Sequence, residues 1–310
     1  MTSGVRAGAG VLAALSGDLA GAVEHAARSV VAIHARRRIP SSGIAWRPGV
    51  VAAASHTITR EEEITLTLPD GNTAAATLAG RDPTTDLAVL RTAAELRPAD
   101  RGNASALEVG HLVLAVGRPG RHATASLGAV SAVDGEWRTW AGGRIDRFIR
   151  LDMAIYDGFS GGPLVEAGGS VLGLNTSRLA RSLAIAIPGS TVDRVVDQVL
   201  ATGGVTRGYL GIASQPVRLP EPLRHRLELP GGLGLMIVNL EPDGPAERAG
   251  LMLGDIVVAL DGAPVSDPTD VLAALGPERV GCPLEARVLR AGQLLTTSIT
   301  VGRRTRGQHR

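Results

Sequence analysis

Residues 157–164, with the sequence Asp-Gly-Phe-Ser-Gly-Gly-Pro-Leu, have the residue types that nucleophilic catalysis requires. The hydroxyl of Ser160 becomes a nucleophile when a neighbouring base removes its proton, and the oxyanion that forms needs hydrogen-bond donors already in place. Glycines on both sides of a serine allow a tight turn that directs backbone N–H groups into one pocket. The motif alone is a weak signal, because the chain holds 40 glycines and Gly/Ser turns are common.

A histidine must act as the base, and His56 is the best placed of the seven in the chain. It directly follows the apolar run Val50–Ala54, which is typical of a buried strand, so the His56 side chain would lie at the end of that strand, at the edge of the sheet. A purely structural histidine at this position is an open alternative. We interpret the other six as solvated or locally bonded: His25, His34, His111, His122, His225 and His309.

The acid that orients the histidine should be buried beside the imidazole. Asp86 fits this role, because it directly precedes the apolar run Leu87–Leu90, which would lead it into the core. Asp82 competes with it, but Asp82 precedes a proline and is more typical of a turn. We interpret Asp152 as structural. The three candidates follow the order His, Asp, Ser at separations of 30 and 74 residues, which is the order of the chymotrypsin class.

The elements that would position these residues are short strands separated by turns, which indicate a β-barrel or sandwich. The expected strands are 64–68, 74–78, 112–116 and 171–174. An apolar stripe at helical spacing then predicts a helix that Ser190 caps, with Asp193 in the capping-box position and Gly203-Gly204 at its end. The stretch Gly203–Gly208 is the expected domain boundary.

A smaller mixed unit is expected after that boundary. Its predicted strands are 235–240 and 256–260, its helix is 269–275 after Pro268, and its closing hairpin joins 284–289 to 294–301. The cluster Gly231–Gly234 lacks the strand–turn–helix context of a nucleotide site, and we interpret it as a loop before a strand.

Composition limits the classes of function. The 310 residues are enough for two domains, and 44% hydrophobic with 20% charged residues is typical of a globular protein. Aromatic residues make up only 2%, which disfavours nucleic-acid binding by base stacking. The single cysteine, Cys282, excludes an intramolecular disulfide and a Cys-based metal cluster. The net charge is +2, and we interpret the basic end 303–310 as a solvated tail.

Taken together, the motifs resemble those of the HtrA/Deg family of trypsin-like serine proteases. The resemblance rests on Ala52–His56, on Asp82–Leu90, on Asp152–Leu164, and on Gly173–Thr176 with Ile185–Pro188. In the second unit, Gly208–Ile212, Asp243–Ala246 and Ala249–Leu251 are similar to segments of PDZ domains.

This resemblance implies a mainly β fold, a chymotrypsin-like double β-barrel followed by a small α+β PDZ domain. The implied bounds are 1–204 for the protease domain with its N-terminal helix, 205–302 for the PDZ domain and 303–310 for the tail. It implies an oxyanion hole from the backbone N–H groups of Gly158 and Ser160, and a carboxylate-binding loop of Tyr209, Leu210, Gly211 and Ile212. Ala154, six residues before Ser160, and Asn175 are expected at the specificity pocket, which would favour small or medium aliphatic side chains. No cofactor and no metal are implied.

The implied partners are unfolded protein substrates and peptide C-termini, with no nucleic acid and no integral membrane segment, and the family also implies a homotrimer. No run of 18 apolar residues and no defensible signal peptide is visible, so the sequence alone favours the cytoplasm, whereas the family implies the cell envelope. Phe159 stands where the family has Asn, and Tyr156-Asp157 stand where it has Asn-Pro. These departures motivate the alternative hypothesis, an inactive protease-fold scaffold or chaperone-like peptide-binding protein.

Overall fold

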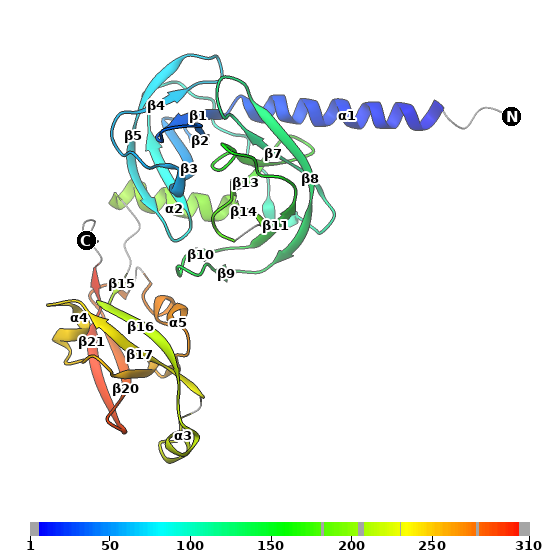
Figure 1. Cartoon of the computed structure of the whole chain (residues 1–310). Coiled ribbons are helices and arrows are strands. Elements are labelled where there is room, and N and C mark those ends of the chain that lie inside the picture. Colours follow the sequence, from blue (N-terminus) through cyan, green and yellow to red (C-terminus); the bar gives the residue numbers. More distant parts are fainter. Residues whose placement is uncertain (1–5, 181–182, 204–207, 230, 277–278, 304–310) are drawn as a thin grey trace. The chain divides into compact units, whose positions relative to one another are not determined.

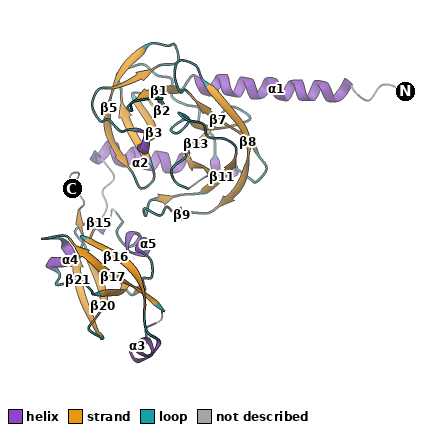
Figure 2. Cartoon of the chain, in the orientation of Figure 1, coloured by secondary structure: helices purple, strands orange, loops and turns teal. Residues whose placement is uncertain are grey.

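The structure is a computed structural model that describes residues 6–180, 183–203, 208–229, 231–276 and 279–303 (Figure 1). The chain divides into two compact units, Met1–Thr139 with Gly143–Val205, and Thr206–Arg310 with Trp140–Gly142. It is mainly β, as the sequence predicts (Figure 2). The expected boundary between 204 and 205 and residues 304–310 of the expected tail lie outside the described residues. The finer domain bounds therefore stay a prediction.

The first barrel is a closed sheet of six antiparallel strands in the order β1-β2-β3-β6-β5-β4. Side chains such as Ile33, Leu66 and Leu90 fill its interior and are fully buried. Alternate residues of a strand point to opposite faces, which is why the alternating pattern at 64–68 predicted β4. The strands are β1 (Val30–His34), β2 (Ser41–Arg47), β3 (Val50–Ala54), β4 (Ile64–Thr67), β5 (Thr73–Asp82) and β6 (Leu87–Arg91).

The second barrel repeats this architecture in the order β11-β14-β13-β12-β7-β8. Its interior is aliphatic, as the low aromatic content requires, with Ile149, Leu164 and Leu172 fully buried. The strands are β7 (Leu112–Gly117), β8 (Thr124–Asp134), β11 (Phe148–Asp152), β12 (Pro163–Glu166), β13 (Val171–Thr176) and β14 (Ala184–Pro188), and a two-stranded sheet pairs β9 (Trp137–Arg138) with β10 (Arg144–Ile145). Two short 3-10 helices also form, η1 (Ser55–Thr57) and η2 (Ala104–Ala106).

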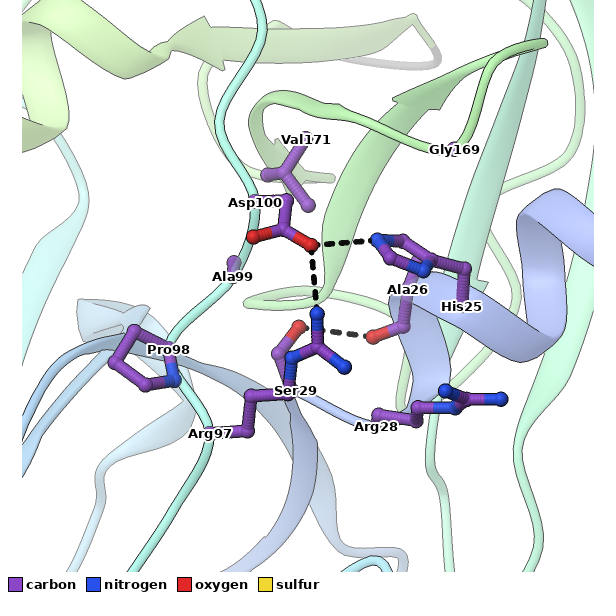
Figure 3. A pocket seen from close by; sticks show the side chains of 10 residues that line it. All are labelled: His25, Ala26, Arg28, Ser29, Arg97, Pro98, Ala99, Asp100, Gly169 and Val171. Carbon is purple, nitrogen blue, oxygen red and sulfur yellow. Dashed lines mark hydrogen bonds and ion pairs between the residues drawn. The ribbon is translucent and has the colours of Figure 1, made fainter.

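Helix α1 (Arg6–Ala27) is attached to the barrels through its C-terminal part, where Ala22 and Ala26 are buried. His25 Nε2 lies 2.7 Å from Asp100 Oδ2, and Arg97 pairs with the same carboxylate at 3.1 Å (Figure 3). The N-terminal part extends away from the barrels (Figure 1), and Val11 is 69% exposed.

Helix α2 (Gly189–Thr202) corrects one prediction. It begins one residue before the expected Ser190 cap, its N-cap residue is Pro188, and no side chain caps it. Asp193 is not in a capping box, because its carboxylate accepts hydrogen bonds from Trp46 Nε1 at 2.9 Å and from Arg101 Nη1 at 2.5 Å. The helix ends as predicted at Gly203, whose φ of 75° is the left-handed conformation that favours glycine.

The second unit is built on a sheet with the order β16-β17-β18-β20-β21. The predicted strands 235–240 and 256–260 and the predicted hairpin all form. The helix after Pro268 forms with a capping box between Asp267 and Asp270 but ends earlier than expected, at Ala273. The strands are β15 (Gly208–Tyr209), β16 (Ile212–Arg218), β17 (Leu233–Leu240), β18 (Ile256–Leu260), β19 (Ala263–Pro264), β20 (Pro283–Arg290), β21 (Gln293–Thr300) and β22 (Gly302–Arg303), and the helices are α3 (Glu221–Arg226), α4 (Pro245–Arg248) and α5 (Pro268–Ala273).

A buried ion pair connects the end of β20 to Asp255, the residue directly before β18. The Asp255 side chain is 2% exposed and lies 2.7 Å from Arg290 Nη2. Burial raises the pKa of Asp255, but hydrogen bonds from the Arg290 guanidinium and the Met252 N–H outweigh it, so the pKa lies below its usual value.

Candidate active site

The His56 and Asp86 side chains meet at one end of the first barrel. His56 lies in η1 directly after β3, and Asp86 lies in the turn between β5 and β6. His56 Nδ1 is 2.7 Å from Asp86 Oδ2, and the His56 backbone N–H donates to Asp86 Oδ1 at 2.9 Å. The Asp86 side chain is 1% exposed and the His56 side chain 18%. A buried carboxylate thus holds the ring by one nitrogen and leaves the other edge accessible.

The backbone of Asp86 is strained in a way that serves this contact. Its φ of 59° is left-handed, a conformation that costs a non-glycine residue on the order of 1–3 kcal/mol. The Asp86 carbonyl accepts a hydrogen bond from Ser55 N at 2.9 Å, so backbone and carboxylate both engage η1. Asp82, the competing acid, instead accepts hydrogen bonds from Thr84 and Thr85 in the turn, as predicted.

Thr176 is a functional candidate that the sequence reasoning missed. It lies at the end of β13 in the second barrel, and its Oγ1 donates to Asp86 Oδ2 at 2.5 Å. The two residues are 90 positions apart, so no local pattern connects them. The motif Gly173–Thr176 contributes to the family resemblance, but its residue types alone indicate no role for the threonine.

Ser160 lies in the loop between β11 and β12 and is 6% exposed. Two glycines after it are sterically required. A Cβ on Gly161 would lie 2.1 Å from Ser42 O, and a Cβ on Gly162 would lie 2.1 Å from Val116 O. The loop therefore packs directly on strands of both barrels, which places the serine where they meet.

Phe159, the departure next to the nucleophile candidate, is a core residue. It is 2% exposed and its ring stacks edge-on with Tyr156 at a centroid distance of 5.5 Å. A Cβ on Gly117 would come within 2.7 Å of the Phe159 ring, so the glycine provides the space for the aromatic side chain. The ring thus points into the protein beside β7.

Ser42 and Arg118 support the loop that contains Gly158 and Ser160 through hydrogen bonds. Ser42 Oγ donates to Gly158 O at 2.6 Å and accepts from Arg118 N at 2.7 Å. The Arg118 guanidinium is itself buried among backbone carbonyls, including Val30 O at 2.7 Å, and burial lowers its pKa. These contacts orient the Gly158 carbonyl inward, and sequence reasoning gave no signal for them.

The backbone amides beside Ser160 have an uneven set of partners. Phe159 N donates to Tyr156 O and Gly161 N donates to Asn175 O, whereas neither Gly158 N nor Ser160 N donates a hydrogen bond within the described residues. Gly158 has a φ of 88°, which a side chain would strain. Two unpaired N–H groups therefore flank Phe159, as an anion site requires.

The Ser160 hydroxyl is oriented toward Ser177. Its Oγ lies 3.1 Å from Ser177 Oγ and accepts a hydrogen bond from Ser177 N at 3.3 Å. In the described part of the chain, no hydrogen bond joins it to the His56 ring. Thr176 and Ser177 are adjacent residues, so Asp86 and Ser160 contact the same end of β13.

The two residues expected at the specificity pocket differ in burial. Ala154 is exposed, in the loop that leads to Ser160. Asn175 is fully buried, and its Nδ2 donates to Pro163 O at 2.7 Å while its backbone binds both Gly161 and Gly162. Asn175 thus contacts the Ser160 loop and not the protein surface.

The expected carboxylate-binding loop connects β15 to β16. Gly211 has a φ of 77°, and within the described residues neither Leu210 N nor Gly211 N donates a hydrogen bond. The carbonyls of the same residues are used, because Ala246 N donates to Leu210 O and Glu241 N to Gly211 O. Among the described residues, the carbonyls of Leu210 and Gly211 thus have hydrogen-bond partners and their N–H groups do not, which leaves the N–H groups for a ligand.

Outside this site, the described residues offer few other candidates for a catalytic or metal-binding site. His25 also pairs with a carboxylate, but the nearby Ser29 hydroxyl donates to Ala26 O (Figure 3). No group of three or more His, Cys, Asp or Glu side chains among the described residues could hold a metal ion. None of the helices described here combines the length and apolar character needed to cross a membrane.

Comparisons with known proteins assign each of the two units to a domain family. Residues 41–174 match the family of trypsin-like peptidase domains, and residues 208–301 match the PDZ domain family. The fold and the two matches define a trypsin-like serine peptidase domain followed by one PDZ domain.

Relatives and solved structures narrow the class. The chain is 35% identical over 274 residues to a probable periplasmic serine endoprotease DegP-like of Halomonas elongata, covering 86% of this chain and 57% of the relative. It is 38% identical over 232 residues to the protein of the same description in Brucella suis, covering 72% and 44%. The chain thus spans about half the length of these curated relatives. The HtrA-type protease AlgW with tripeptide is 30% identical with a TM-score of 0.70, covering 93% of this chain and 98% of that one. The chain belongs to the HtrA/Deg family of trypsin-like serine proteases.

Proposed function

We propose that this protein is a serine endopeptidase in which Ser160 is the nucleophile, His56 the base and Asp86 the orienting acid. The observation that carries the proposal is the buried contact of His56 Nδ1 with Asp86 Oδ2 at 2.7 Å, beside a serine loop with two unpaired N–H groups. A carboxylate at Nδ1 holds the imidazole in the tautomer whose Nε2 can accept a proton.

The proposed reaction has two displacement steps. The Ser160 hydroxyl proton passes to His56 Nε2 while Oγ bonds to the substrate carbonyl carbon, and the carbonyl electrons form an oxyanion. The N–H groups of Gly158 and Ser160 stabilise that oxyanion. His56 then gives the proton to the leaving amine as the C–N bond breaks, and water hydrolyses the acyl-enzyme by the same route. Ser160 must first rotate from Ser177 toward His56.

Thr176 acts as a positioning residue in this scheme. Its hydroxyl donates to the carboxylate oxygen that also faces His56, so Asp86 has three donors and stays oriented. Specificity is proposed to favour small or medium aliphatic side chains, because Ala154 adds no charge near the serine loop. Asn175 would shape this pocket only through the loop that it supports.

The second unit is proposed to bind peptide C-termini. The unpaired N–H groups of Leu210 and Gly211 suit a carboxylate, and strand β16 lies at the edge of its sheet, where an extended peptide can add as a further strand. Unfolded proteins are the proposed substrates. The names of the curated relatives support a site of action in the cell envelope, and a homotrimer stays a prediction that sedimentation would test.

Hydrolysis of casein, a protein with little folded structure, tests the endopeptidase proposal. We expect the purified chain to cleave casein and the Ser160→Ala variant to lose this activity. Ser298→Ala is the matched control, because Ser298 is exposed on β21. Equal activity of Ser160→Ala would overturn the assignment of the nucleophile.

The scaffold hypothesis is supported by one observation, the orientation of the Ser160 hydroxyl toward Ser177. A scaffold would not cleave casein even when peptides with free C-termini are added, yet it would still bind those peptides. An endopeptidase whose serine rotates on substrate binding would cleave.

A further inference from the structure

The two residues that follow β7 support the glycine loop at separate points. The Arg118 N–H donates to Ser42 Oγ at 2.7 Å, and that hydroxyl donates to Gly158 O at 2.6 Å. Pro119, the next residue, packs on Gly158 itself, because a Cβ on Gly158 would lie 2.7 Å from Pro119 Cβ. Both contacts act on the residue whose N–H is a proposed oxyanion donor. The position of Gly158 therefore depends on where residues 118 and 119 lie.

The Arg118 side chain anchors these residues to a distant part of the chain. Arg118 is 5% exposed, and all three guanidinium nitrogens donate to backbone carbonyls. Nε donates to Val30 O at 2.7 Å, Nη1 to Arg121 O at 2.6 Å and Nη2 to Ala27 O at 3.1 Å. Within the part of the chain that the structure describes, no carboxylate pairs with this guanidinium. Backbone carbonyls alone therefore compensate its charge.

One of these carbonyls belongs to the last residue of helix α1. Ala27 ends the helix, and Arg118 is 91 positions away in the sequence. The final carbonyls of a helix lack partners within it and carry partial negative charge, so a cation there is stabilised. If the end of α1 moved away, the buried guanidinium would lose this acceptor, which is costly for a charge without a counter-ion. The docked helix and the Arg118 position thus stabilise each other.

Helix α1 is attached to the barrels by few contacts. Ala22 and Ala26 are buried, and His25 pairs with Asp100 at 2.7 Å (Figure 3). Further from the barrels the helix has little cover, since Leu12 is 68% exposed. A single substitution on the buried face can therefore release the end of α1 while the interiors of both barrels stay packed.

We propose that Arg118 is a positioning residue that links helix α1 to the oxyanion loop, so that rapid hydrolysis requires the end of α1 to be docked. The proposal rests on the proposed peptidase activity. The link runs from Ala27 O through the Arg118 side chain and its N–H to Ser42 and Gly158. Arg118 contacts no reacting atom and acts only through the placement of the Gly158 N–H. Because that donor acts on charge that develops in the transition state, loss of the link lowers kcat and leaves KM nearly unchanged.

Two substitutions of Arg118 test the link in the full chain. Arg118→Met keeps the length of the side chain and removes its donors, so kcat on a chromogenic peptide should fall by about 10- to 100-fold. KM should change by less than about two-fold. Labelling of Ser160 by a fluorophosphonate should slow by the same factor as kcat. Arg118→Lys keeps the charge but not the planar fork of donors, so it should recover part of the lost kcat.

Substitutions in helix α1 test the same link from its other end. Ala22→Asp places a charge on the buried face, which should release the helix and lower kcat as Arg118→Met does. The double variant should be no slower than the slower single variant, because both changes interrupt one path. Leu12→Asp, on the exposed part of the helix, is the matched control and should leave kcat unchanged.

A third control separates positioning from a general loss of stability. Leu90→Ala creates a cavity in the first barrel and should lower the melting temperature at least as much as Arg118→Met, with kcat within about two-fold of wild type. If Leu90→Ala lowers kcat as much as Arg118→Met does, the role of Arg118 is structural only and the proposal fails. If Arg118→Met does not fold, Arg118→Lys and Ala22→Asp decide the test through their kcat values.

The outcomes distinguish this proposal from the proposed function. A wild-type chain that cleaves the peptide, with Arg118 and Ala22 variants that cleave at the same rate, would overturn the link and leave the peptidase standing. Losses that multiply in the double variant would also overturn it, because the two sites would then act separately. A wild-type chain that neither cleaves nor takes up the label would overturn both proposals.

Discussion

Two glycine loops, one in each unit, present backbone N–H groups in the same way and differ in what surrounds them. Gly158 and Gly211 both have positive φ, 88° and 77°, and each lies in a loop where two N–H groups donate no hydrogen bond within the described residues. The Gly158 loop contains Ser160 and lies beside the end of β13 that contacts Asp86. The Gly211 loop opens onto the edge of a sheet.

This difference separates binding from catalysis. A set of oriented N–H groups attracts negative charge wherever it occurs. In the second unit that charge would be a carboxylate that the ligand already carries, so the loop can only bind. In the first unit the charge would form during the reaction, because a serine and a buried His–Asp pair are adjacent. Variants of the two loops should therefore affect separate properties, hydrolysis for the first and peptide affinity for the second.

The largest expected effect follows from removal of the base. His56→Ala should reduce casein hydrolysis by about 10⁶-fold, and the double variant with Ser160→Ala should be no worse than either single one, because the residues act as a unit. Peptide affinity should not change. Additive losses in the double variant would show that the two side chains act separately.

The next effect concerns the orientation of the base. Asp86→Asn keeps the size of the side chain but favours the wrong tautomer of His56, and kcat should fall by about 10⁴-fold. Steady-state kinetics on a chromogenic peptide would measure this. Asp70→Asn, in an exposed turn, is the control, and a loss below tenfold for Asp86→Asn would contradict the orienting role.

Gly158→Ala tests the first loop directly. The added Cβ would lie 2.7 Å from Pro119 Cβ and 2.8 Å from Pro40 O, at a φ that a side chain rarely adopts. The loop must shift, and kcat should fall by about 10²–10³-fold with the loss of one oxyanion donor. Gly169→Ala has a similarly positive φ of 94° without such close contacts and is the matched control.

Gly211→Ala makes the corresponding change in the second loop. Its Cβ would approach the Tyr209 hydroxyl at 3.3 Å, and its φ of 77° would be strained. Peptide affinity, measured by fluorescence polarisation, should fall by about 10- to 30-fold through a weakened bond to the carboxylate. The control is Gly250→Ala, with a φ of 81° and open space around it. Equal losses in both variants would assign the effect to backbone strain alone.

The smallest effect is expected for Thr176→Val. It removes one donor to Asp86 and keeps the shape, while two hydrogen bonds from His56 remain. The activity should fall about five-fold. Thr176→Ser keeps the hydroxyl and should restore most of it, and no recovery in this variant would indicate a packing role for Thr176.

The sequence indicated the strands, and His56 and Asp86 as separate candidates, because those signals are local. Alternating strands, a histidine after a buried run and an acid before another run are visible within a few residues. The contacts from Thr176 to Asp86 and from Ser42 to Gly158 cross between barrels over 90 and 116 positions, and nothing local encodes them. The failed cap at Ser190 has the same cause, since Trp46 and Arg101 engage Asp193 from distant segments.

The most direct test of the account is labelling of Ser160 by a fluorophosphonate probe, followed by identification of the modified peptide. Only a serine activated by its base beside donors for an oxyanion reacts rapidly. We predict rapid labelling at Ser160 in the wild-type chain, and labelling slowed by at least about 10³-fold in His56→Ala. A wild-type chain that takes up no label, with or without peptide ligands, would contradict the proposed enzyme.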